Sequence, residues 1–471
     1  MTRASPATGD VPAAVSADDP LMPHIDGETS DLRIARGRAA RTAVPLPAHA
    51  DFPGPARRTD PFALLAGQDA GRVPELLPVR YGRMAASPLA YFHGAALPAA
   101  ADLATTPRTG LVVQACGDAH LGNFGLFATD DHRLTFDLVD FDETLPAPWE
   151  WDVKRLAASV EVAAREDGHA PAQRRRAVLG AVESYRQAMH DFARRTPQQI
   201  RAALADAGAL RTIALHRAGT AGRRRFTEVR AGRLRFAASP PAVVPAGRLA
   251  GDGDPVTLEE RLGVVLARYR RSLGPAPRAR LDRYRLADAA RKVVGVGSVG
   301  TRCWLLLLVG PGTEAPLILQ VKEAGPSVLQ GYTGGAVRGE PGRRVVTGQR
   351  LLQAVGDGFL GWARSSGFDG CSREFYVRRP REVRGAAEGA AMTPNVLRAR
   401  SRLCGWTLAR AHARTGDPLA IAAYLGSGPA FAEAVREFAV ACADQNERDH
   451  TALREAIRGG HVAAAGITSA G

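Results

Sequence analysis

Gly295-Val296-Gly297-Ser298-Val299-Gly300 decides the fold, because the residues after it have the pattern of a strand and not of a helix. A dinucleotide-binding fingerprint requires a helix directly after its glycines. Here residues 302–309 form an apolar run typical of a strand, and a Gly-Pro-Gly turn then leads to a second strand at 317–323. Alone, this glycine spacing equally fits a tight turn. In this context we expect Gly295, Gly297, Ser298 and Gly300 to lie against phosphate groups.

Lys322 lies in the second of these strands and belongs to a scarce residue type. The chain has 62 lysines and arginines, but the only lysines are Lys154, Lys292 and Lys322. A compact ammonium is not replaced by a planar guanidinium. Strand, glycine loop, strand and lysine-bearing strand resemble the nucleotide lobe of protein kinases, where the lysine pairs with the α- and β-phosphates. The alternative is an ordinary surface lysine.

A second group of polar residues begins at Gly117-Asp118-Ala119-His120-Leu121-Gly122-Asn123, between strand candidates at 111–116 and 124–128. After a turn and a third strand candidate, at 134–139, come Asp140 and Asp142. Asp118 and Asn123 have the spacing of the kinase catalytic loop, in which Asp is the base and Asn binds metal. We therefore predict Asp118 as the base, with His120 orienting it. Asn123, Asp140 and Asp142 are the predicted Mg²⁺ ligands, and a turn with capping side chains is the alternative.

The sequence of this loop, Gly-Asp-x-His-x-Gly-Asn, resembles that of aminoglycoside- and choline-type phosphotransferases more than that of protein kinases. The order of the two groups is unusual, because the glycine loop comes after the catalytic loop instead of preceding it. A circular permutation accounts for this order, since domain termini often lie close together. The segment 408–413 supports it, because it resembles the helix that precedes the catalytic loop in small-molecule kinases yet lies near the end of the chain.

The chain as a whole resembles the bacterial family called domain of unknown function 2252, over roughly residues 60–455. The motifs that carry the resemblance are 80–84 with 87–88, 117–125, 136–144, 149–155, 295–302, 320–324 and 348–350. The resemblance implies a fold relationship and no established activity. One departure from kinases concerns the helix after the lysine strand, which carries Val345-Val346-Thr347-Gly348-Gln349-Arg350 and lacks the expected glutamate. Glu340 and Glu323 are the candidate replacements.

Composition sets the outer limits of the prediction. The chain has 471 residues, 45% apolar and 23% charged, as in folded globular proteins. It has no apolar run long enough for a membrane span and no signal-peptide pattern at its start, so we predict a cytoplasmic protein. Five cysteines without a CxxC pair indicate neither a disulfide framework nor a thiolate zinc site. The net charge of +14 is scattered in short arginine runs, which favours a solvated surface over nucleic-acid binding.

The predicted fold class is α/β (α+β), a two-lobed, circularly permuted protein-kinase-like fold. We expect a disordered leader at 1–58, a helical lobe with the catalytic loop and metal-binding hairpin at 59–289, a β-rich nucleotide lobe at 290–380, and helices at 381–460 that complete the helical lobe. Within these divisions, residues 278–292 are predicted to be helical and 293–300 to be a strand.

The predicted function is ATP-dependent transfer of a phosphoryl group to a hydroxyl, with Mg²⁺. The alternatives are a nucleotide-binding pseudokinase or regulatory module and, more remotely, a metal-dependent phosphoesterase. Gly117-Asp118-Ala119-His120 also opens the metallophosphatase signature, but the further Asp, Asn and His blocks of that class are absent from the sequence. No spacing rule identifies the acceptor or the oligomeric state.

Overall fold

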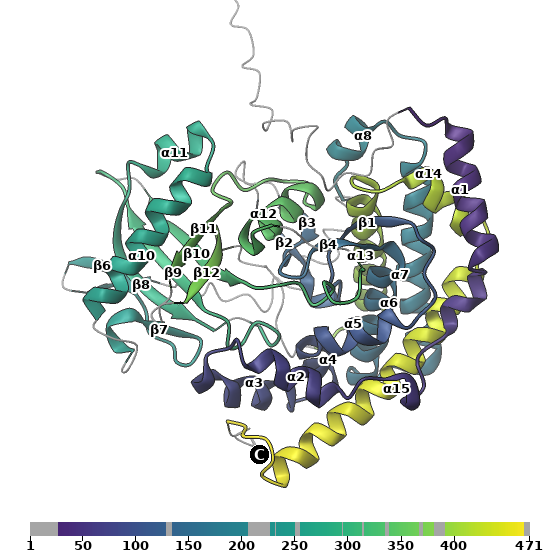
Figure 1. Cartoon of the computed structure of the whole chain (residues 1–471), viewed down its shortest axis with the longest axis horizontal. Coiled ribbons are helices and arrows are strands. Elements are labelled where there is room, and N and C mark those ends of the chain that lie inside the picture. Colours follow the sequence, from purple (N-terminus) through teal and green to yellow (C-terminus); the bar gives the residue numbers. More distant parts are fainter. Residues whose placement is uncertain are drawn as a thin grey trace, which may run out of the picture.

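The computed structural model describes residues 27–128, 134–205, 227–230, 232–249, 255–293, 295–312, 315–334, 339–366, 371–380 and 391–465. Helices account for 52% of the structure and strands for 17%, so the chain is of the α+β class. In Figure 1 the large sheet occupies the left-hand side and a body of packed helices the right-hand side, with short strands between them. No described helix is both long and apolar enough to cross a membrane.

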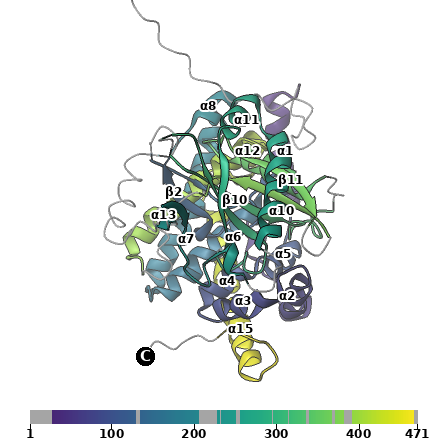
Figure 2. The same cartoon turned by 90° about the vertical axis from the view of Figure 1, so that its left-hand side faces the viewer.

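The large sheet has six antiparallel strands in the order β11-β12-β10-β9-β8-β7. Their bounds are β7 Val243–Pro245, β8 Arg285–Lys292, β9 Cys303–Val309, β10 Leu317–Ala324, β11 Gly361–Ser366 and β12 Ser372–Arg378. Successive side chains of a strand point to opposite faces. Leu319 and Val321 therefore pack into one apolar cluster with α10 (Pro255–Tyr269), whereas Lys322 points the other way. Figure 2 shows α10 in front of the sheet.

On the Lys322 face, α12 (Pro341–Leu352) packs against β10, β11 and β12. Arg344 of α12 donates hydrogen bonds to the carbonyl oxygens of Asp142 and Thr144, both at 2.7 Å. This face of the sheet is therefore joined to the segment that comes after β3 (Leu134–Leu138).

Two predictions about the sheet are wrong. Residues 278–292 are not one helix, because α11 (Pro275–Leu281) ends early and β8 begins at Arg285. Residues 295–300 form the loop between β8 and β9 rather than a strand. The alanine-rich 286–290 has a helical composition, but pairing with β9 and burial of Ala289 and Ala290 override it. The sheet also begins well before residue 290, at β7, so the predicted boundary between the lobes cuts through β8.

The helical body is built around α6 (Trp149–Glu166), which is buried along nearly its whole length. Around it pack α4 (Pro88–Gly94), α7 (Pro171–Phe192), α13 (Pro394–Ala413) and α15 (Ala430–Arg458). The other helices of this body are α2 Pro61–Asp69, α3 Leu77–Met84, α5 Ala96–Ala104, α8 Pro197–Ala202 and α14 Pro418–Leu425. Single 3₁₀ turns occur at Leu46–Ala50, Pro55–Arg57, Pro74–Leu76, Leu121–Asn123, Ala246–Arg248 and Arg270–Ser272.

Three two-stranded ribbons complete the fold. β1 (Val112–Ala115) pairs with β4 (Leu145–Pro148), β2 (Phe124–Ala128) with β3, and β5 (Thr227–Arg230) with β6 (Arg233–Phe236). β1, β2 and β3 were predicted from the sequence, and their bounds agree within about two residues. α13, from near the end of the chain, packs against β1 and β3.

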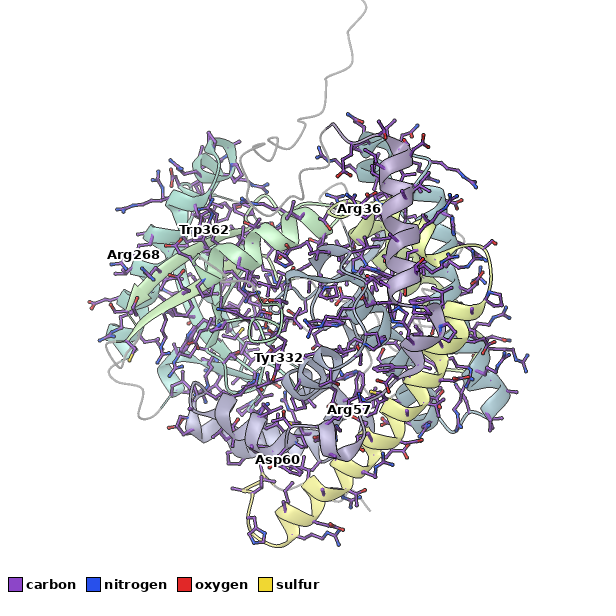
Figure 3. All side chains as sticks on the ribbon, turned by 45° about the vertical axis from the view of Figure 1, so that its right-hand side comes forward. Arg36, Arg57, Asp60, Arg268, Tyr332 and Trp362 are labelled. Carbon is purple, nitrogen blue, oxygen red and sulfur yellow. The ribbon has the colours of Figure 1, made fainter. Side chains whose placement is uncertain are left out.

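Residues 1–58 were predicted to be a disordered leader, and this is wrong for residues 30–43, which form a helix. Residues 1–26 lie outside the described part of the chain, but α1 (Ser30–Ala43) begins at the cap Thr29 and packs against α14. Arg33 and Arg36 both pair with Asp417, and Figure 3 labels Arg36 on this helix. Ion pairs and close packing between residues distant in sequence therefore order a segment whose composition alone gives no sustained period.

Candidate active site

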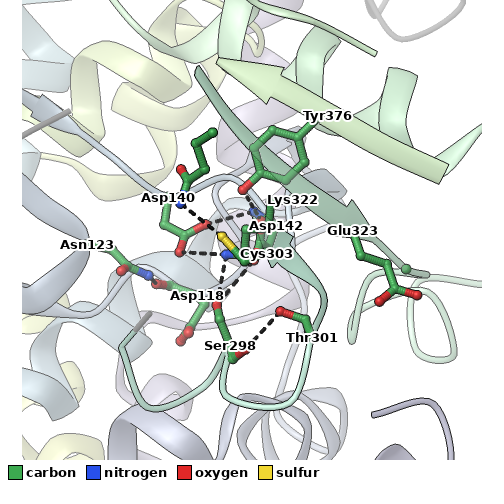
Figure 4. Close-up of polar contacts among 12 residues, drawn as sticks. Asp118, Asn123, Asp140, Asp142, Ser298, Thr301, Cys303, Lys322, Glu323 and Tyr376 are labelled. Carbon is green, nitrogen blue, oxygen red and sulfur yellow. Dashed lines mark hydrogen bonds and ion pairs between the residues drawn. The ribbon is translucent and has the colours of Figure 1, made fainter. Parts of the chain in front are cut away.

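Lys322 lies at the centre of a buried polar cluster between the sheet and the helical body (Figure 4). Its side chain is 2% exposed. The ammonium group pairs with the Asp142 carboxylate, lies 3.8 Å from Asp140 Oδ2 and donates a hydrogen bond of 2.8 Å to Ser298 Oγ. A lysine of the sheet, a serine of the glycine loop and two carboxylates from the segment after β3 therefore meet at one point.

The two carboxylates of this cluster have different environments. Tyr376 of β12 donates a hydrogen bond of 2.7 Å to Asp142 Oδ1. Burial favours the neutral form of both carboxyls, but Lys322 and Tyr376 hold the pKa of Asp142 below its usual value. The pKa of Asp140 is raised by burial and by the neighbouring Asp142. Asp142 is thus the closer partner of Lys322 and the more readily ionised of the two carboxyls.

The charge of Lys322 itself is fixed by the same neighbours. Burial alone would lower its pKa, but Asp140 and Asp142 outweigh burial and raise the pKa well above the usual value. A buried ammonium of this kind remains protonated across the physiological pH range, which suits it to hold an anionic group.

The loop that carries Asp118 is fixed by glycine geometry and by α6. Gly117 has φ +89°, and a Cβ there would collide with the Glu143 carbonyl, so only glycine fits. Asp152, in the first turn of α6, accepts hydrogen bonds from the backbone N–H groups of Cys116 (2.6 Å) and Gly117 (3.0 Å). His412 of α13 lies 3.1 Å from the same carboxylate. Asp152 therefore ties the catalytic-loop candidate to two helices of the body.

Asp118 itself is paired. Arg155 Nε donates to Asp118 Oδ1 at 2.9 Å, and His120 Nε2 lies 3.5 Å from Oδ2. Burial raises the pKa of Asp118, and Arg155 opposes that shift. Asn123 Nδ2 donates to the Asp118 carbonyl oxygen at 2.8 Å, and the Asn123 carbonyl accepts from Val139 N at 3.0 Å. The predicted base and the predicted metal ligand Asn123 thus lie in one connected loop, next to the strand that leads to Asp140.

The glycine loop is seated on the N-terminal helices. Arg83 of α3 donates a hydrogen bond of 2.6 Å to the Gly295 carbonyl, and Val73 N donates to the Gly300 carbonyl at 2.8 Å. Gly295 and Gly300 have φ of +56° and +93°, which favour glycine. A Cβ on Gly297 would lie 3.0 Å from the His93 carbonyl oxygen. Arg83, in the motif at 80–84, therefore supports this loop.

The glutamates considered as partners of Lys322 lie elsewhere. Glu323 pairs with Arg302 at 3.3 Å and with Arg373 at 3.0 Å, so it is not the replacement. Glu340 is the residue that precedes α12. At the centre of α12 stands Gln349, whose Oε1 lies 3.5 Å from Arg378 NH1. Within the described residues, Asp140 and Asp142 take the place of a helix glutamate as the ion-pair partners of Lys322.

The oxygen atoms of Asp140, Asp142 and Asn123 suit a hard divalent cation. Mg²⁺ is held by one or two carboxylates, with waters and substrate phosphates completing its octahedron. In the described part of the chain no three His, Cys, Asp or Glu side chains are grouped to hold a metal by themselves. Asp140 and Asp142 lie side by side, so a Mg²⁺ ion here would need water and phosphate oxygens besides these two carboxylates.

Sequence reasoning missed Arg155, Tyr376 and His93, which complete the surroundings of the cluster. Arg155 comes about one turn of α6 after Asp152, and this helical spacing places both on the face toward Asp118. That spacing was a usable signal. Tyr376 and His93 carried none, because only cross-strand register and helix packing bring them to the site.

Comparison with known families gives one match. The model of the family described as an uncharacterized protein conserved in bacteria (DUF2252) matches residues 72–456. The match includes the catalytic-loop candidate, the segment after β3, the glycine loop and Lys322. No curated protein and no solved structure matches the chain.

Proposed function

The chain belongs to this DUF2252 family of bacterial proteins, and we propose that it is an ATP-dependent phosphotransferase with a kinase-like, circularly permuted fold. The observation that carries the proposal is the meeting of Lys322 with Asp140 and Asp142 next to the glycine loop. A phosphate-pairing lysine and metal-binding carboxylates in contact are the two parts that phosphoryl transfer requires. ATP, Mg²⁺ and a cytoplasmic location belong to the same proposal.

The path of the chain supports the permutation. From β8 it runs through the glycine loop, β9, the lysine strand β10, α12, β11 and β12, and then into α13. α13 packs against β1, which precedes the Asp118 loop, and against β3, which leads to Asp140. Traced from β8 to the C-terminus and then from β1 onward, these elements have the order of a kinase domain.

Each residue has a defined task in the proposed reaction. Lys322 pairs with the α- and β-phosphates after releasing Ser298, and the backbone amides at Gly295, Gly297 and Gly300 cover the phosphates. Asp140, Asp142 and Asn123 would hold Mg²⁺, which neutralises charge on the phosphates when bound. Asp118 Oδ accepts the proton of the acceptor hydroxyl as the hydroxyl oxygen attacks the γ-phosphorus. The bond between the γ-phosphorus and the bridging oxygen of the β-phosphate breaks, and ADP leaves with that oxygen. Catalysis of this type is mainly positioning and charge stabilisation.

Nucleotide binding without transfer is the second candidate, and two observations favour it. Lys322 has Asp142 rather than a glutamate of α12 as its close partner. Asp118 is held by Arg155, so its carboxylate must be reoriented or shared before it accepts a proton. ATP binding with no turnover would select this candidate.

The test compares the wild type with Asp140→Asn, and with Asp191→Asn on the exposed face of α7 as the matched control. Calorimetry with Mg²⁺ and a non-hydrolysable ATP analogue measures binding, and release of labelled phosphate to a panel of hydroxyl compounds measures transfer. We expect Asp140→Asn to lose metal-dependent binding and all transfer while circular dichroism is unchanged. Retained turnover in Asp140→Asn, or absence of ATP binding to the wild type, refutes the assignment.

A further inference from the structure

The last turn of α4, residues 92–94, touches both halves of the site. α4 packs against α3, α6 and α15, and it lies outside the segments that carry the catalytic and phosphate-binding candidates. Phe92 and His93 each make a specific contact toward those segments, and Gly94 lies against Met84 of α3. They have no place in the proposed roles described so far.

Phe92 anchors the arginine that holds Asp118. Arg155 NH2 donates a hydrogen bond of 2.7 Å to the Phe92 carbonyl, and its guanidinium lies 3.7 Å from the centroid of the Phe92 ring. Arg155 is 4% exposed, and its Nε donates to Asp118 Oδ1. A planar guanidinium with donors on two edges bridges these partners while stacking on the ring, which an ammonium cannot do.

His93 supports the other side of the same carboxylate. Its ring stacks on His120, with centroids 4.1 Å apart and an interplanar angle of 23°. Burial keeps both rings neutral by lowering their pKa values well below the usual value, so the stack carries no charge repulsion. His120 Nδ1 accepts from Gly122 N at 3.1 Å, which leaves Nε2 as the protonated nitrogen toward Asp118 Oδ2.

His93 also forms the floor of the glycine loop. A Cβ on Gly297 would lie 3.0 Å from the His93 carbonyl oxygen, so the loop backbone runs directly over this residue. The loop is held on the same side by Arg83, whose neighbour Met84 packs over Gly94. The residue that stacks on the catalytic-loop histidine is therefore the residue on which the glycine loop lies.

We propose that residues 92–94 are a shared positioning platform: they orient Asp118 through Arg155 and His120, and they support the glycine loop, so that base orientation and nucleotide binding are coupled. This inference rests on the proposed phosphotransferase function. Arg155 is a positioning residue in it, because it acts through Asp118 and does not touch the phosphates.

The experiment is a double-mutant cycle in the full chain between Arg155→Lys and Gly297→Ala. Arg165→Lys is the matched control, since Arg165 also lies on α6 and pairs with Glu161, far along the helix from Asp118. Arg155→Lys keeps the charge but loses the bridge to Phe92. We expect kcat to fall about 100-fold from misplacement of the base, and Kd for Mg²⁺ with a non-hydrolysable ATP analogue to rise at least threefold. Arg165→Lys should change neither value by more than twofold.

The effects of the two substitutions on kcat/KM should depart from multiplicative behaviour by at least threefold, as expected for coupled sites. Multiplicative effects within twofold, or an unchanged Kd in Arg155→Lys, overturn the platform. Phe92→Leu, which keeps the carbonyl and a similar volume but removes the ring, is the second variant. Phe92→Leu should change kcat and Kd in the same direction as Arg155→Lys, and it replaces Arg155→Lys in the test if that variant folds poorly.

A third readout separates this inference from the proposed function. The backbone N–H groups of Val299 and Thr301 bond within the loop at 3.2 and 3.1 Å, so their hydrogen exchange reports loop order without nucleotide. Arg155→Lys should speed their exchange at least threefold, and Arg165→Lys should not. Faster exchange in a protein that binds no ATP supports the structural link between Arg155 and the glycine loop, but refutes the phosphotransferase and with it the coupling to nucleotide binding. Unchanged exchange in a protein that does bind ATP refutes the platform alone.

Discussion

Replacement of Lys322 by methionine tests the buried charge cluster through the free energy of unfolding. The Lys322 side chain is 2% exposed, and its partners Asp142 and Asp140 are 23% and 29% exposed. Removing one partner of a buried ion pair costs about 3–5 kcal/mol, because the other charge is left uncompensated. The carboxylates here retain some access to water, so we expect a loss of about 3 kcal/mol, at the lower end of that range.

The double variant Lys322→Met, Asp142→Asn should recover part of this loss, because it removes the stranded charge and leaves Tyr376 a hydrogen-bond acceptor. We expect a coupling of about 2 kcal/mol between the two positions. Without the ammonium, the folded-state pKa of the carboxyls rises above the unfolded value. The folded state then binds more protons, so the deficit of Lys322→Met should grow as pH rises.

Urea denaturation monitored by circular dichroism measures these differences. Lys292→Met is the matched control, because Lys292 is the lysine at the end of neighbouring β8 and is only half-buried. We expect the control to change the unfolding free energy by less than about 1 kcal/mol. If Lys322→Met costs no more than Lys292→Met, the cluster does not act as a buried ion pair, and the expected loss is wrong.

Two further predictions concern stability. Burial lowers the pKa of His49 to about 3, below the unfolded value near 6.5. The unfolded state therefore binds more protons, and the free energy of unfolding falls as pH drops below about 6.5. In urea titrations between pH 6 and 4, His49→Gln should reduce this dependence on pH by up to about 1.4 kcal/mol per pH unit. A Cβ at Gly405 of α13 would collide with the Ala181 carbonyl of α7, whereas Gly263 of α10 faces open space. Gly405→Ala should therefore lower the unfolding free energy by about 2 kcal/mol and Gly263→Ala raise it by up to about 1 kcal/mol; thermal melts in which both variants shift the same way would contradict this packing.

Local patterns predicted several strands of the fold. The β2–β3 hairpin, β9 and β10 each have their own apolar pattern and flanking turn residues, and their predicted bounds are close to those of the structure. β8 was missed because Leu286-Ala287-Asp288-Ala289-Ala290 has no β-branched residue. Pairing with β9 decides the conformation of this segment, and the composition of the segment does not reveal that pairing.

The candidate site also has a part that the sequence predicted and a part that it did not. Motif spacing predicted Lys322, Asp118, Asn123, Asp140 and Asp142 as site residues, and the structure brings Lys322, Asp140 and Asp142 together. The spacing did not predict that Asp142 is the close partner of Lys322, since the direction of the Asp142 side chain depends on its hydrogen bond with Tyr376 of β12. The support of the glycine loop by residues 72–94 was equally out of reach, because it joins segments about 200 residues apart.

A crystal structure of the protein with Mg²⁺ and a non-hydrolysable ATP analogue would decide whether Lys322 and the carboxylates beside it form a nucleotide site. We predict an α- or β-phosphate oxygen within about 3 Å of Lys322 Nζ, Ser298 displaced from that nitrogen, and the metal on Asp140. A nucleotide bound elsewhere, with Lys322 still bonded to Ser298 and Asp142, would show that the phosphotransferase assignment is wrong.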